Sequence, residues 1–440
     1  MKNKNAISVI GLGKLGVCSA ACLALKGFNV IGVDISKNCV DSINNGRVPI
    51  QEPGLQETID RARGRFKATH SYEEAVKESD ITFLIVPTPS KDDGHFSDEY
   101  LQDCLKHLSN ALRTTPKEYH LFVITSTVSP GTTDERLIPL IEAESGKKLN
   151  KDFGVCYNPE FIALGSVIKD FLNPDMLLIG ESDQRAGDII EWVYKRTCEN
   201  KPYYARMSII SAEITKISLN CYVTMKISFA NTLANICEKI PNTDVDAIAK
   251  ALGSDRRVSP YYLKGGLSFG GPCFPRDNQA FMAFTKQYNY DAKLARATDE
   301  VNMLQTEILA NRVFAHMAEG QKNVAILGLA YKPDTPVIDE SPSIKLIEIL
   351  LKRKLELIVY DPLAMDNTQS HFGDVIQYAT SARDCFARSS LCIIATQISE
   401  FKAIDESYIV HLPTTIIDCW RILDSKTLSH NVHYIAVGRS

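Results

Sequence analysis

The stretch VIGLGKLG, residues 9–16, constrains the fold of this 440-residue chain more than any other segment. It places Gly11, Gly13 and Gly16 in G-x-G-x-x-G spacing between an apolar, strand-like segment and a helical one. In this setting the first glycine permits a tight turn, the second lets a pyrophosphate approach the backbone, and the third allows close helix–strand packing. The amino end of the following helix favours the phosphate charge. The motif therefore predicts a dinucleotide-binding βαβ unit.

The end of the second predicted strand, NVIGVD, indicates which dinucleotide binds. Asp34 closes this strand, about twenty positions beyond Gly11, where a carboxylate can accept a hydrogen bond from a ribose 2′-hydroxyl. A carboxylate would repel a 2′-phosphate, so the sequence favours NAD over NADP. Two later strands end in VPTPS (86–90) and TSTVSPGTT (125–133), at the edge where such sheets bind ligands. Ser126 and Thr127 can donate to a ligand oxygen there, although hydroxyls at strand ends also commonly cap the next helix.

Short Val- and Ile-rich segments alternate with helical segments in both halves of the chain. In the first half they cover residues 6–11, 29–34, 81–87 and 121–126, and the alternation restarts at Asn323 with NVAILGLA, LELIVYD, LCIIAT, TIIDC and HYIAVG. Residues 209–240 contain neither glycine nor proline and predict one long helix. The pattern predicts an α/β protein, with two Rossmann-like doubly wound parallel-sheet domains joined by that helix.

The bulk composition excludes several classes of protein. A net charge of −4 and a pI near 6.2 provide no basic surface for nucleic acid. No apolar run reaches the roughly 18 residues of a membrane span, and the first residues lack the apolar core of a signal peptide. The 12 cysteines include no Cys-x-x-Cys pair, which favours reduced thiols and a cytoplasmic location.

The stretch FGGPCFPRD, residues 269–277, surrounds Cys273 with glycine and proline. Such a segment is expected to be neither helix nor central strand, and it is either a turn with a small apolar residue or a presented nucleophile. An NAD site together with a presented thiol indicates chemistry in which the thiol traps an aldehyde. The thiohemiacetal loses hydride and becomes a thioester, which water hydrolyses.

This chemistry needs an ammonium or amide group for the oxyanion and a carboxylate for the protons. Lys216, Asn220, Glu160 and Asp277 supply these types. Glu213, Lys216 and Asn220 share one face of the predicted long helix. Taken alone, Glu213 and Lys216 are typical of a solvated surface pair, and Glu160 in the turn NPEF is typical of a structural carboxylate.

These motifs, in this order and over essentially the whole chain, resemble the UDP-glucose/GDP-mannose dehydrogenase family. The matching segments are GLGKLG, EPGL (52–55), VPTPS, STVSPGTT, NPEF with GSVIKDFLNPD (158–175), AEITKISLN (212–220), FGGPCFPRD and LGLAYKPDT (327–335). The resemblance implies oxidation of the C6 hydroxymethyl group of a nucleotide sugar to a carboxylate, with two NAD per turnover and no metal. It also implies a homodimer or higher homo-oligomer and a role in polysaccharide precursor synthesis.

The resemblance implies three domains and a set of site residues. The domains are an NAD-binding domain (1–205), a central helical domain for dimerisation and catalysis (206–318) and a UDP-sugar-binding domain (319–440). The catalytic positions are Cys273 as nucleophile, Lys216 and Asn220 for the oxyanions, Glu160 and Thr127 for proton transfer or water activation, and Asp277 near the thiol. The cofactor positions are Gly11, Gly13, Lys14, Leu15, Gly16, Asp34, Pro87, Thr88, Ser126 and Thr127. The substrate positions are Phe161, Lys216, Arg257 (reaching a partner subunit's sugar nucleotide), Tyr262, Lys264, Gly270, Lys332 and Arg421.

The chain also departs from the family pattern. The family often has a second glutamate where this chain has Leu164, an arginine in the place of Asp339 and a basic residue in the place of Cys39. Pro272 and Arg276 replace a serine and a lysine beside the thiol. These departures concern the pyrophosphate contacts and the identity of the sugar, and they predict a divergent branch of the family.

Several alternatives stay open at this stage. UDP-glucose is the expected substrate, followed by UDP-N-acetylhexosamines and GDP-mannose. A two-electron β-hydroxyacid dehydrogenase would share the first domain and the Lys-x-x-x-Asn helix, but it would need neither Cys273 nor a second α/β domain. A short-chain-type epimerase would use the Tyr222 and Lys226 of YVTMK, but Tyr222 lies in an apolar helix and is expected in the core. A non-catalytic nucleotide-sugar binder would not require the thiol, Lys216 or Asn220.

Overall fold

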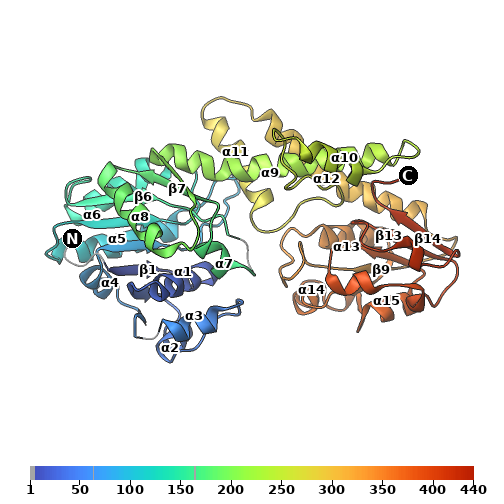
Figure 1. Cartoon of the computed structure of the whole chain (residues 1–440), viewed down its shortest axis with the longest axis horizontal. Coiled ribbons are helices and arrows are strands. Elements are labelled where there is room, and N and C mark those ends of the chain that lie inside the picture. Colours follow the sequence, from blue (N-terminus) through green and yellow to red (C-terminus); the bar gives the residue numbers. More distant parts are fainter. Residues whose placement is uncertain (1–4, 63, 163–164) are drawn as a thin grey trace. The chain divides into compact units, whose positions relative to one another are not determined.

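The structure, a computed structural model, describes residues 5–62, 64–162 and 165–440, so Leu164 lies outside the described residues. The chain forms two compact units, residues 1–218 and 219–440. Helix α9 (Ile209–Cys237) begins in the first unit and ends in the second (Figure 1). The prediction of one long helix over 209–240 is thus confirmed, with its last residues forming a turn instead. The three-domain division stays a prediction.

The first unit is built on an eight-stranded sheet with the order β3-β2-β1-β4-β5-β6-β7-β8. Neighbouring strands are parallel except for the antiparallel pair β6 and β7. The sequence predicted β1, β2, β4 and β5, and the apolar segment FGVCY before the turn NPEF also predicted β6, whereas β3, β7 and β8 were not predicted. The strands are β1 (Ala6–Ile10), β2 (Asn29–Val33), β3 (Phe66–Thr69), β4 (Ile81–Leu84), β5 (His120–Ile124), β6 (Phe153–Tyr157), β7 (Met176–Glu181) and β8 (Tyr203–Met207).

Helices cover both faces of this sheet. Successive strand side chains alternate between two apolar clusters: on β1, Val9 belongs to one and Ile10 to the other. Helices α1 and α8 supply the first cluster, and α4, α5 and α6 the second, which is the doubly wound arrangement that the sequence predicted. The helical segments are α1 (Lys14–Leu25), α2 (Lys37–Asn44), α3 (Leu55–Arg61), α4 (Tyr72–Glu78), α5 (Glu99–Thr114), the π-helical turn η1 (Thr133–Leu137), α6 (Ile138–Ser145), α7 (Val167–Leu172) and α8 (Gln184–Thr197).

The second unit contains a six-stranded parallel sheet with the order β11-β10-β9-β12-β13-β14. Its strands are β9 (Asn323–Leu327), β10 (Glu356–Tyr360), β11 (Gln377–Tyr378), β12 (Leu391–Ile394), β13 (Thr414–Asp418) and β14 (Val432–Ala436). Its helical segments are α10 (Val245–Ser254), α11 (Phe274–Gln287), α12 (Lys293–Ala315), α13 (Pro342–Lys352), α14 (Met365–Phe372), α15 (Ala382–Arg388) and the short 3₁₀ turns η2 (Gly373–Val375), η3 (Ser399–Ala403), η4 (Glu406–Tyr408) and η5 (Ser425–Thr427). Within the described ranges, no helix is both long and apolar enough to cross a membrane.

The two sheets share one topology, because the six strands of the second sheet repeat the order of the first six strands of the first. The strand order therefore reverses between β1 and β4 in one unit and between β9 and β12 in the other, and such points bind ligands at the carboxyl ends of the strands. A left-handed glycine follows the first strand of each sheet: Gly11 has φ 87° and Gly328 has φ 95°. The two halves of the sequence share an alternating pattern but not their residues, so no repeat was predicted, yet the backbone repeats one topology.

An aspartate ends the second strand in both units, but its surroundings differ. Asp34, after β2, is partly buried and accepts two backbone hydrogen bonds, from Leu12 and Ser36. Asp361, after β10, is 1% exposed. Its carboxylate accepts from the backbone N–H groups of Leu329 (2.8 Å), Ala330 (3.2 Å), Leu363 (2.9 Å) and Ala364 (2.9 Å). Asp361 thus stabilises two turns of the second unit.

Replacing Asp361 should therefore unfold the second unit more easily. Asp361→Ala leaves several buried N–H groups without an acceptor, which should lower the free energy of unfolding by at least about 3 kcal/mol. Chemical denaturation followed by circular dichroism measures this loss. Asp374→Ala, which removes an exposed carboxylate of the same unit, is the control and should change little. Equal stability of the two variants would contradict the assigned role.

Candidate active site

The turn after β1 fits the pyrophosphate of a dinucleotide. A Cβ atom at Gly11 would overlap the carbonyl of Ile85, and one at Gly16 would overlap the carbonyl of Gly11. A Cβ atom at Gly13 would meet nothing within 4 Å, so the space beside the amino end of α1 is open. Asp34 adds a partly buried carboxylate held by the N–H groups of Leu12 and Ser36, each at 2.7 Å. These residues fit NAD, with open space for phosphate and an acceptor for ribose hydroxyls.

The departure at Cys39 removes positive charge from this region. Its thiol lies 3.6 Å from the carbonyl oxygen of Leu12, and it is nearly buried. Burial, assisted by the charge of Asp34, raises the pKa of Cys39 to about 11, so the side chain is a neutral thiol. Of the neighbouring predicted cofactor positions, Lys14 is exposed and Leu15 partly buried.

The hydroxyl groups at the ends of β4 and β5 bond to the two loops and not to a helix. The Ser126 hydroxyl donates to the carbonyl of Val86 (2.7 Å) and accepts from its N–H (2.9 Å). The Thr88 hydroxyl donates to the carbonyl of Thr127 (2.7 Å). These bonds join the loops that carry Pro87, which is exposed, and Thr127, which is partly exposed. The ligand contact of Ser126 stays a prediction, and its hydroxyl bonds to both backbone groups of Val86.

Glu213 is not part of a solvated surface pair, so that interpretation of the sequence is wrong. It is fully buried, and Lys216 is only 8% exposed. The Glu213 carboxylate accepts from the N–H groups of Gly131 (2.6 Å) and Thr133 (3.0 Å) at the start of η1. Burial raises the pKa of Glu213 to about 7, although the Thr133 hydroxyl and the two N–H donors oppose the shift. Glu213 therefore attaches the loop after β5 to α9, one turn before Lys216.

Lys216, Glu160 and Phe161 lie together in the first unit. The Lys216 ammonium donates to the backbone carbonyl of Glu160 at 2.6 Å and lies 4.4 Å from the centre of the Phe161 ring. The Glu160 carboxyl oxygen Oε1 lies 3.1 Å from the hydroxyl of Tyr194 on α8. Burial raises the pKa of Glu160 to about 7, while Tyr194 and the charge of Lys216 lower it. A carboxyl group with this pKa can exchange protons near neutral pH.

Cys273 lies at the amino end of a helix. The expectation that residues 269–277 form no helix is wrong for their second half, because α11 begins at Phe274. Pro275 fits the first helical turn, where the N–H group that proline lacks would have no partner in the helix. Cys273 is exposed, whereas every other cysteine is buried or partly buried, and the twelve cysteines, all within the described ranges, are thiols and not disulfides. The amino end of a helix also favours the negative charge of a thiolate.

A buried polar pair lies one helical turn beyond the thiol. Asp277 is 1% exposed, and its N–H donates to the carbonyl of Cys273 at 2.8 Å. Its carboxylate accepts from the Asn220 amide at 2.6 Å and, at 3.4 Å, from Arg276, one of the residues that departs from the family pattern. An asparagine amide has two N–H groups, so one remains to donate elsewhere.

Three side-chain amides hold the irregular segment that leads to the thiol. Asn302 on α12 bonds to both backbone groups of Phe269, accepting from its N–H (2.7 Å) and donating to its carbonyl (3.0 Å). Asn231 on α9 accepts from the N–H of Gly266 and donates to Leu267, and Gln305 donates to the carbonyl of Gly266. The sequence analysis missed these residues. The available signal was a pair of amide side chains, Asn302 and Gln305, at positions of α12 that face buried residues.

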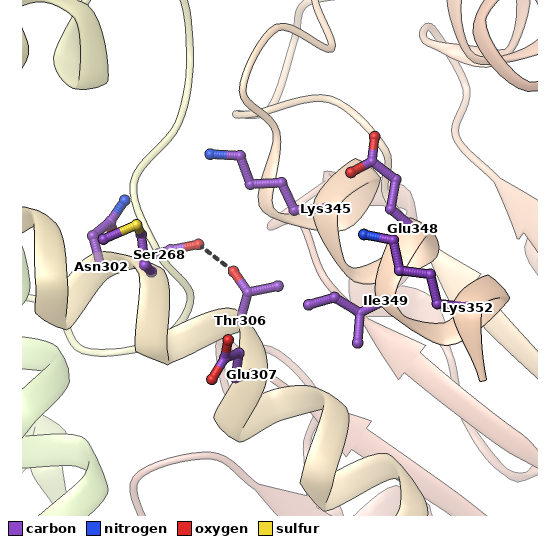
Figure 2. A pocket seen from close by; sticks show the side chains of 9 residues that line it. Ser268, Asn302, Thr306, Glu307, Lys345, Glu348, Ile349 and Lys352 are labelled. Atoms are coloured by element: carbon purple, nitrogen blue, oxygen red, sulfur yellow. Dashed lines mark hydrogen bonds between the residues drawn. The ribbon is translucent and has the colours of Figure 1, made fainter.

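Figure 2 shows Asn302 beside Ser268, whose hydroxyl lies 3.1 Å from that of Thr306. These residues line a cleft of about 190 Å³ between α12 and α13. Lys345, on its other side, is paired with Glu340 at 2.5 Å. The cleft lies where the segment with the thiol rests on α12.

The backbone of residues 339–340 packs against the same segment. A Cβ atom at Gly270 would overlap the carbonyl of Glu340, and the N–H of Gly271 donates to the carbonyl of Asp339 at 3.0 Å. Glycine at position 270 is thus required by close backbone approach. The side chain of Asp339, which departs from the family pattern, is exposed.

The other predicted substrate residues lie in the second unit and differ in their exposure and contacts. Tyr262 is exposed, has φ 60° and packs edge-on against Phe274. Lys264 donates to Gln397 at 2.8 Å, and the Lys332 ammonium lies 5.8 Å from the ring of Tyr331. The exposed side chain of Arg257 pairs with Asp255 at 2.7 Å.

Arg421 is buried, unlike the predicted substrate residues Tyr262, Lys264 and Arg257. The side chain is 0% exposed. Its guanidinium bonds to both carboxylate oxygens of Asp246, each at 2.8 Å, and to the carbonyls of Gly265 and Val437. Arg421 thus connects α10, through Asp246, and the residue after β14, Val437, to Gly265 in the segment that leads to the thiol.

Tyr222 and Lys226 of α9 have different surroundings. Tyr222 is 57% exposed, so its predicted core position is wrong. Lys226 donates to the carbonyls of Val258 and Ser259.

Models of the UDP-glucose/GDP-mannose dehydrogenase family match the chain in three parts. The NAD binding domain matches residues 5–198, the central domain residues 210–303 and the UDP binding domain residues 325–425. The chain belongs to this family. It is an NAD-dependent nucleotide-sugar 6-dehydrogenase, as the resemblance in sequence implied.

Individual relatives agree with this assignment. UDP-glucose 6-dehydrogenase AglM from Haloferax volcanii is 37% identical over 420 residues, covering 95% of this chain and 97% of the relative. GDP-mannose 6-dehydrogenase from Pseudomonas putida is 36% identical over 359 residues, covering 81% of this chain and 80% of the relative. The solved structure of a UDP-glucose dehydrogenase from Pyrobaculum islandicum superposes with a TM-score of 0.89 at 31% identity, covering 99% and 98% of the two chains.

The amide contacts of Asn302 should matter for turnover. Asn302→Leu keeps the side-chain size but leaves both backbone groups of Phe269 without partners, which should displace the segment before Cys273. We expect kcat to fall about tenfold to a hundredfold, because small displacements of reacting groups are costly. Steady-state NADH production measures this, and alkylation of Cys273 by iodoacetamide reports on the thiol directly. Met303→Ala, at an exposed position next to it, should be near wild type. Wild-type kcat and alkylation in Asn302→Leu would contradict this role.

Proposed function

We propose that this enzyme oxidises UDP-glucose to the uronic acid in two successive two-electron steps, with Cys273 as the covalent nucleophile. The observation that carries the proposal is the exposed thiol at the amino end of α11, next to the buried pair of Asn220 and Asp277. A two-electron alcohol dehydrogenase needs no such thiol, and a binding protein needs no such pair.

The first oxidation converts the C6 alcohol to an aldehyde, and the hydroxyl proton passes to solvent by way of the Glu160 carboxylate. NAD, when bound, accepts the hydride in each of the two oxidations. The Lys216 ammonium, which donates to the carbonyl of Glu160, supplies the positive charge that stabilises the C6 oxygen as it loses its proton. Phe161 contacts the Lys216 side chain and restricts where the ammonium lies.

The second stage takes place on the thiol. The exposed Cys273 thiol loses its proton to solvent, and the thiolate attacks the aldehyde carbon, so that the carbonyl oxygen becomes the oxyanion of a thiohemiacetal. The free N–H of the Asn220 amide donates to this oxyanion, while Asp277 holds the amide in one orientation. Lys216, one helical turn before Asn220 on α9, adds positive charge. Loss of the second hydride leaves a thioester.

Hydrolysis of the thioester completes the reaction. The Glu160 carboxylate takes a proton from the attacking water, with Thr127 as a further hydroxyl for orientation. A base with a pKa near 7 suits this task, because it is ionised at neutral pH and still accepts a proton readily. The C–S bond then breaks, and the thiol is regenerated.

The choice of UDP-glucose rests on the relatives, since two of those described above carry that name. GDP-mannose is the second candidate, because a relative of similar identity is named for it. For the substrate contacts we propose Tyr262, Lys264, Lys332, Arg257 and the backbone at Gly270. Arg421 contributes indirectly, through the carbonyl of Gly265.

We also propose a homo-oligomeric enzyme of the cytoplasm that serves polysaccharide precursor synthesis. Large apolar side chains are exposed along α9, among them Tyr222 (57%), Phe229 (52%) and Ile236 (47%), and they suit contact with another copy of the chain. The free thiols are compatible with a reducing compartment.

Stoichiometry distinguishes this proposal from its rivals. The enzyme should form two NADH for each UDP-glucose consumed, with NADH measured by absorbance and the loss of UDP-glucose by chromatography. In a panel with UDP-N-acetylhexosamines and GDP-mannose, kcat/KM should be highest for UDP-glucose. Cys273→Ser should lose acid formation by a factor of about 10³ or more. Cys198→Ser, at a partly buried thiol, is the matched control. One NADH per substrate, or normal acid formation by Cys273→Ser, would refute the mechanism.

Glu160 should control the last step and its pH dependence. In Glu160→Gln the thioester on Cys273 should accumulate, detectable by mass spectrometry of the intact protein, and kcat should fall about a hundredfold. In the wild type, kcat should rise with pH through about 7, because only the ionised carboxylate acts as base and burial raises its pKa to about 7. A kcat that stays constant from about pH 5.5 to about pH 8.5, a range that brackets this pKa, would exclude Glu160 as the base.

A further inference from the structure

The hydroxyl of Tyr194 lies between two oxygen atoms that compete for its hydrogen. It is 2.7 Å from Oδ1 of Asn158 and 3.1 Å from Oε1 of Glu160. Tyr194 comes from α8 and is 1% exposed, and Asn158 follows β6 and is fully buried. Neither residue belongs to the catalytic set described above.

The orientation of Asn158 is determined by its other hydrogen bond. Its Nδ2 donates to the carbonyl of Leu178 at 2.9 Å, and a carbonyl can only accept. Oδ1 of Asn158 must therefore face Tyr194 as an acceptor. A phenol has one hydrogen to donate, but its oxygen can also accept. Tyr194 can thus donate fully to only one of its two neighbours at a time.

The protonation state of Glu160 decides which neighbour receives the hydrogen. When Glu160 is ionised, its carboxylate is the stronger acceptor and takes the hydroxyl hydrogen. When Glu160 is protonated, its own O–H can donate to the Tyr194 oxygen, and the hydroxyl hydrogen then turns to Asn158. The Glu160 carboxyl group therefore keeps Tyr194 as a partner in both states, whereas Oδ1 of Asn158 receives the hydroxyl hydrogen only when Glu160 is protonated.

We propose that Tyr194 is a positioning residue for Glu160, whose hydroxyl rotates between Glu160 and Asn158 as Glu160 loses and gains a proton. The device holds the carboxyl group in one place through the proton-transfer cycle of thioester hydrolysis. The inference rests on the proposed role of Glu160 as the base of that step.

The other titratable groups near this pair do not replace Tyr194. Lys216 from α9 faces the carboxyl and lowers its pKa, while Cys22 from α1 and Cys198 after α8 lie nearby as neutral thiols, because burial raises their pKa values. Burial also raises the pKa of Tyr194 well above its usual range, and Tyr204 from β8 adds to that effect. Tyr194 therefore keeps its hydrogen over the working pH range.

Tyr194→Phe removes the hydroxyl alone and tests the proposal. The ionised form of Glu160 loses a donor, so its pKa rises by about one unit and the acid limb of the kcat profile moves to higher pH by that amount. On the acid limb, kcat should fall about tenfold, and well above pH 8 it should return to near the wild-type plateau. A purely structural defect would instead lower kcat by the same factor at every pH.

Tyr119→Phe is the matched control. Tyr119 is as buried as Tyr194, but its hydroxyl has no hydrogen-bond partner among the described residues. It should keep the wild-type pH profile. An unshifted profile in Tyr194→Phe, or the same shift in both variants, would overturn the proposal.

Infrared difference spectroscopy separates this inference from the proposed function. The carboxyl band that Glu160→Gln removes should titrate at higher pH in Tyr194→Phe, whether or not Glu160 is the base. Normal turnover by Glu160→Gln would refute the base but leave this shift intact. If Tyr194→Phe does not fold, the wild type still decides: a tyrosine C–O band should change with the Glu160 midpoint and stay constant in Glu160→Gln. A constant band in the wild type would overturn the proposal.

Discussion

Backbone polar groups away from water must have hydrogen-bond partners, and the segments that carry the chemistry here lack the partners that a sheet or helix provides. Side chains on neighbouring helices supply them. Asn302 bonds to both backbone groups of Phe269, as a neighbouring strand would, and Glu213 accepts from two N–H groups of the loop after β5. The segment before Cys273 is therefore attached to α12, and the loop with Thr127 to α9. Each takes its position from a rigid element, which proximity catalysis requires.

The same backbone turn serves two purposes in the two units. Both units have a left-handed glycine after the first strand and an aspartate after the second. Asp34 accepts hydrogen bonds from two backbone N–H groups and remains partly exposed, so its oxygens can also accept from ribose hydroxyls. Asp361 is buried, and four N–H groups occupy its oxygens. The accessible carboxylate of Asp34 thus suits dinucleotide binding in the first unit. The equivalent carboxylate of Asp361 stabilises turns in the second unit.

Periodic features were predictable from the sequence, and features that depend on distant neighbours were not. The main strands, the long helix and the turn at Gly11 follow from local pattern, since their residues interact within one βαβ unit. Strands β3 and β11 are short and partly polar, so no alternation marks them. Tyr222 was expected in the core because its helix is apolar, but a helix with apolar residues all round also exposes some of them. Asn302 and Tyr194 act only through contacts with residues far away in the chain.

Glu160 and Glu213 show why a shifted pKa does not identify a catalytic group. Burial raises both pKa values to about 7, and both carboxyls lie near Lys216 along the chain or in space. The hydrogen-bond partners distinguish them. Both carboxylate oxygens of Glu213 accept from backbone N–H groups, which can only donate and so favour the ionised form, and the Thr133 hydroxyl lowers the pKa in the same direction. Glu160 faces a phenol, which can donate or accept and so suits both. A carboxyl that must gain and lose a proton without moving needs a partner of the second kind, and this criterion selects Glu160.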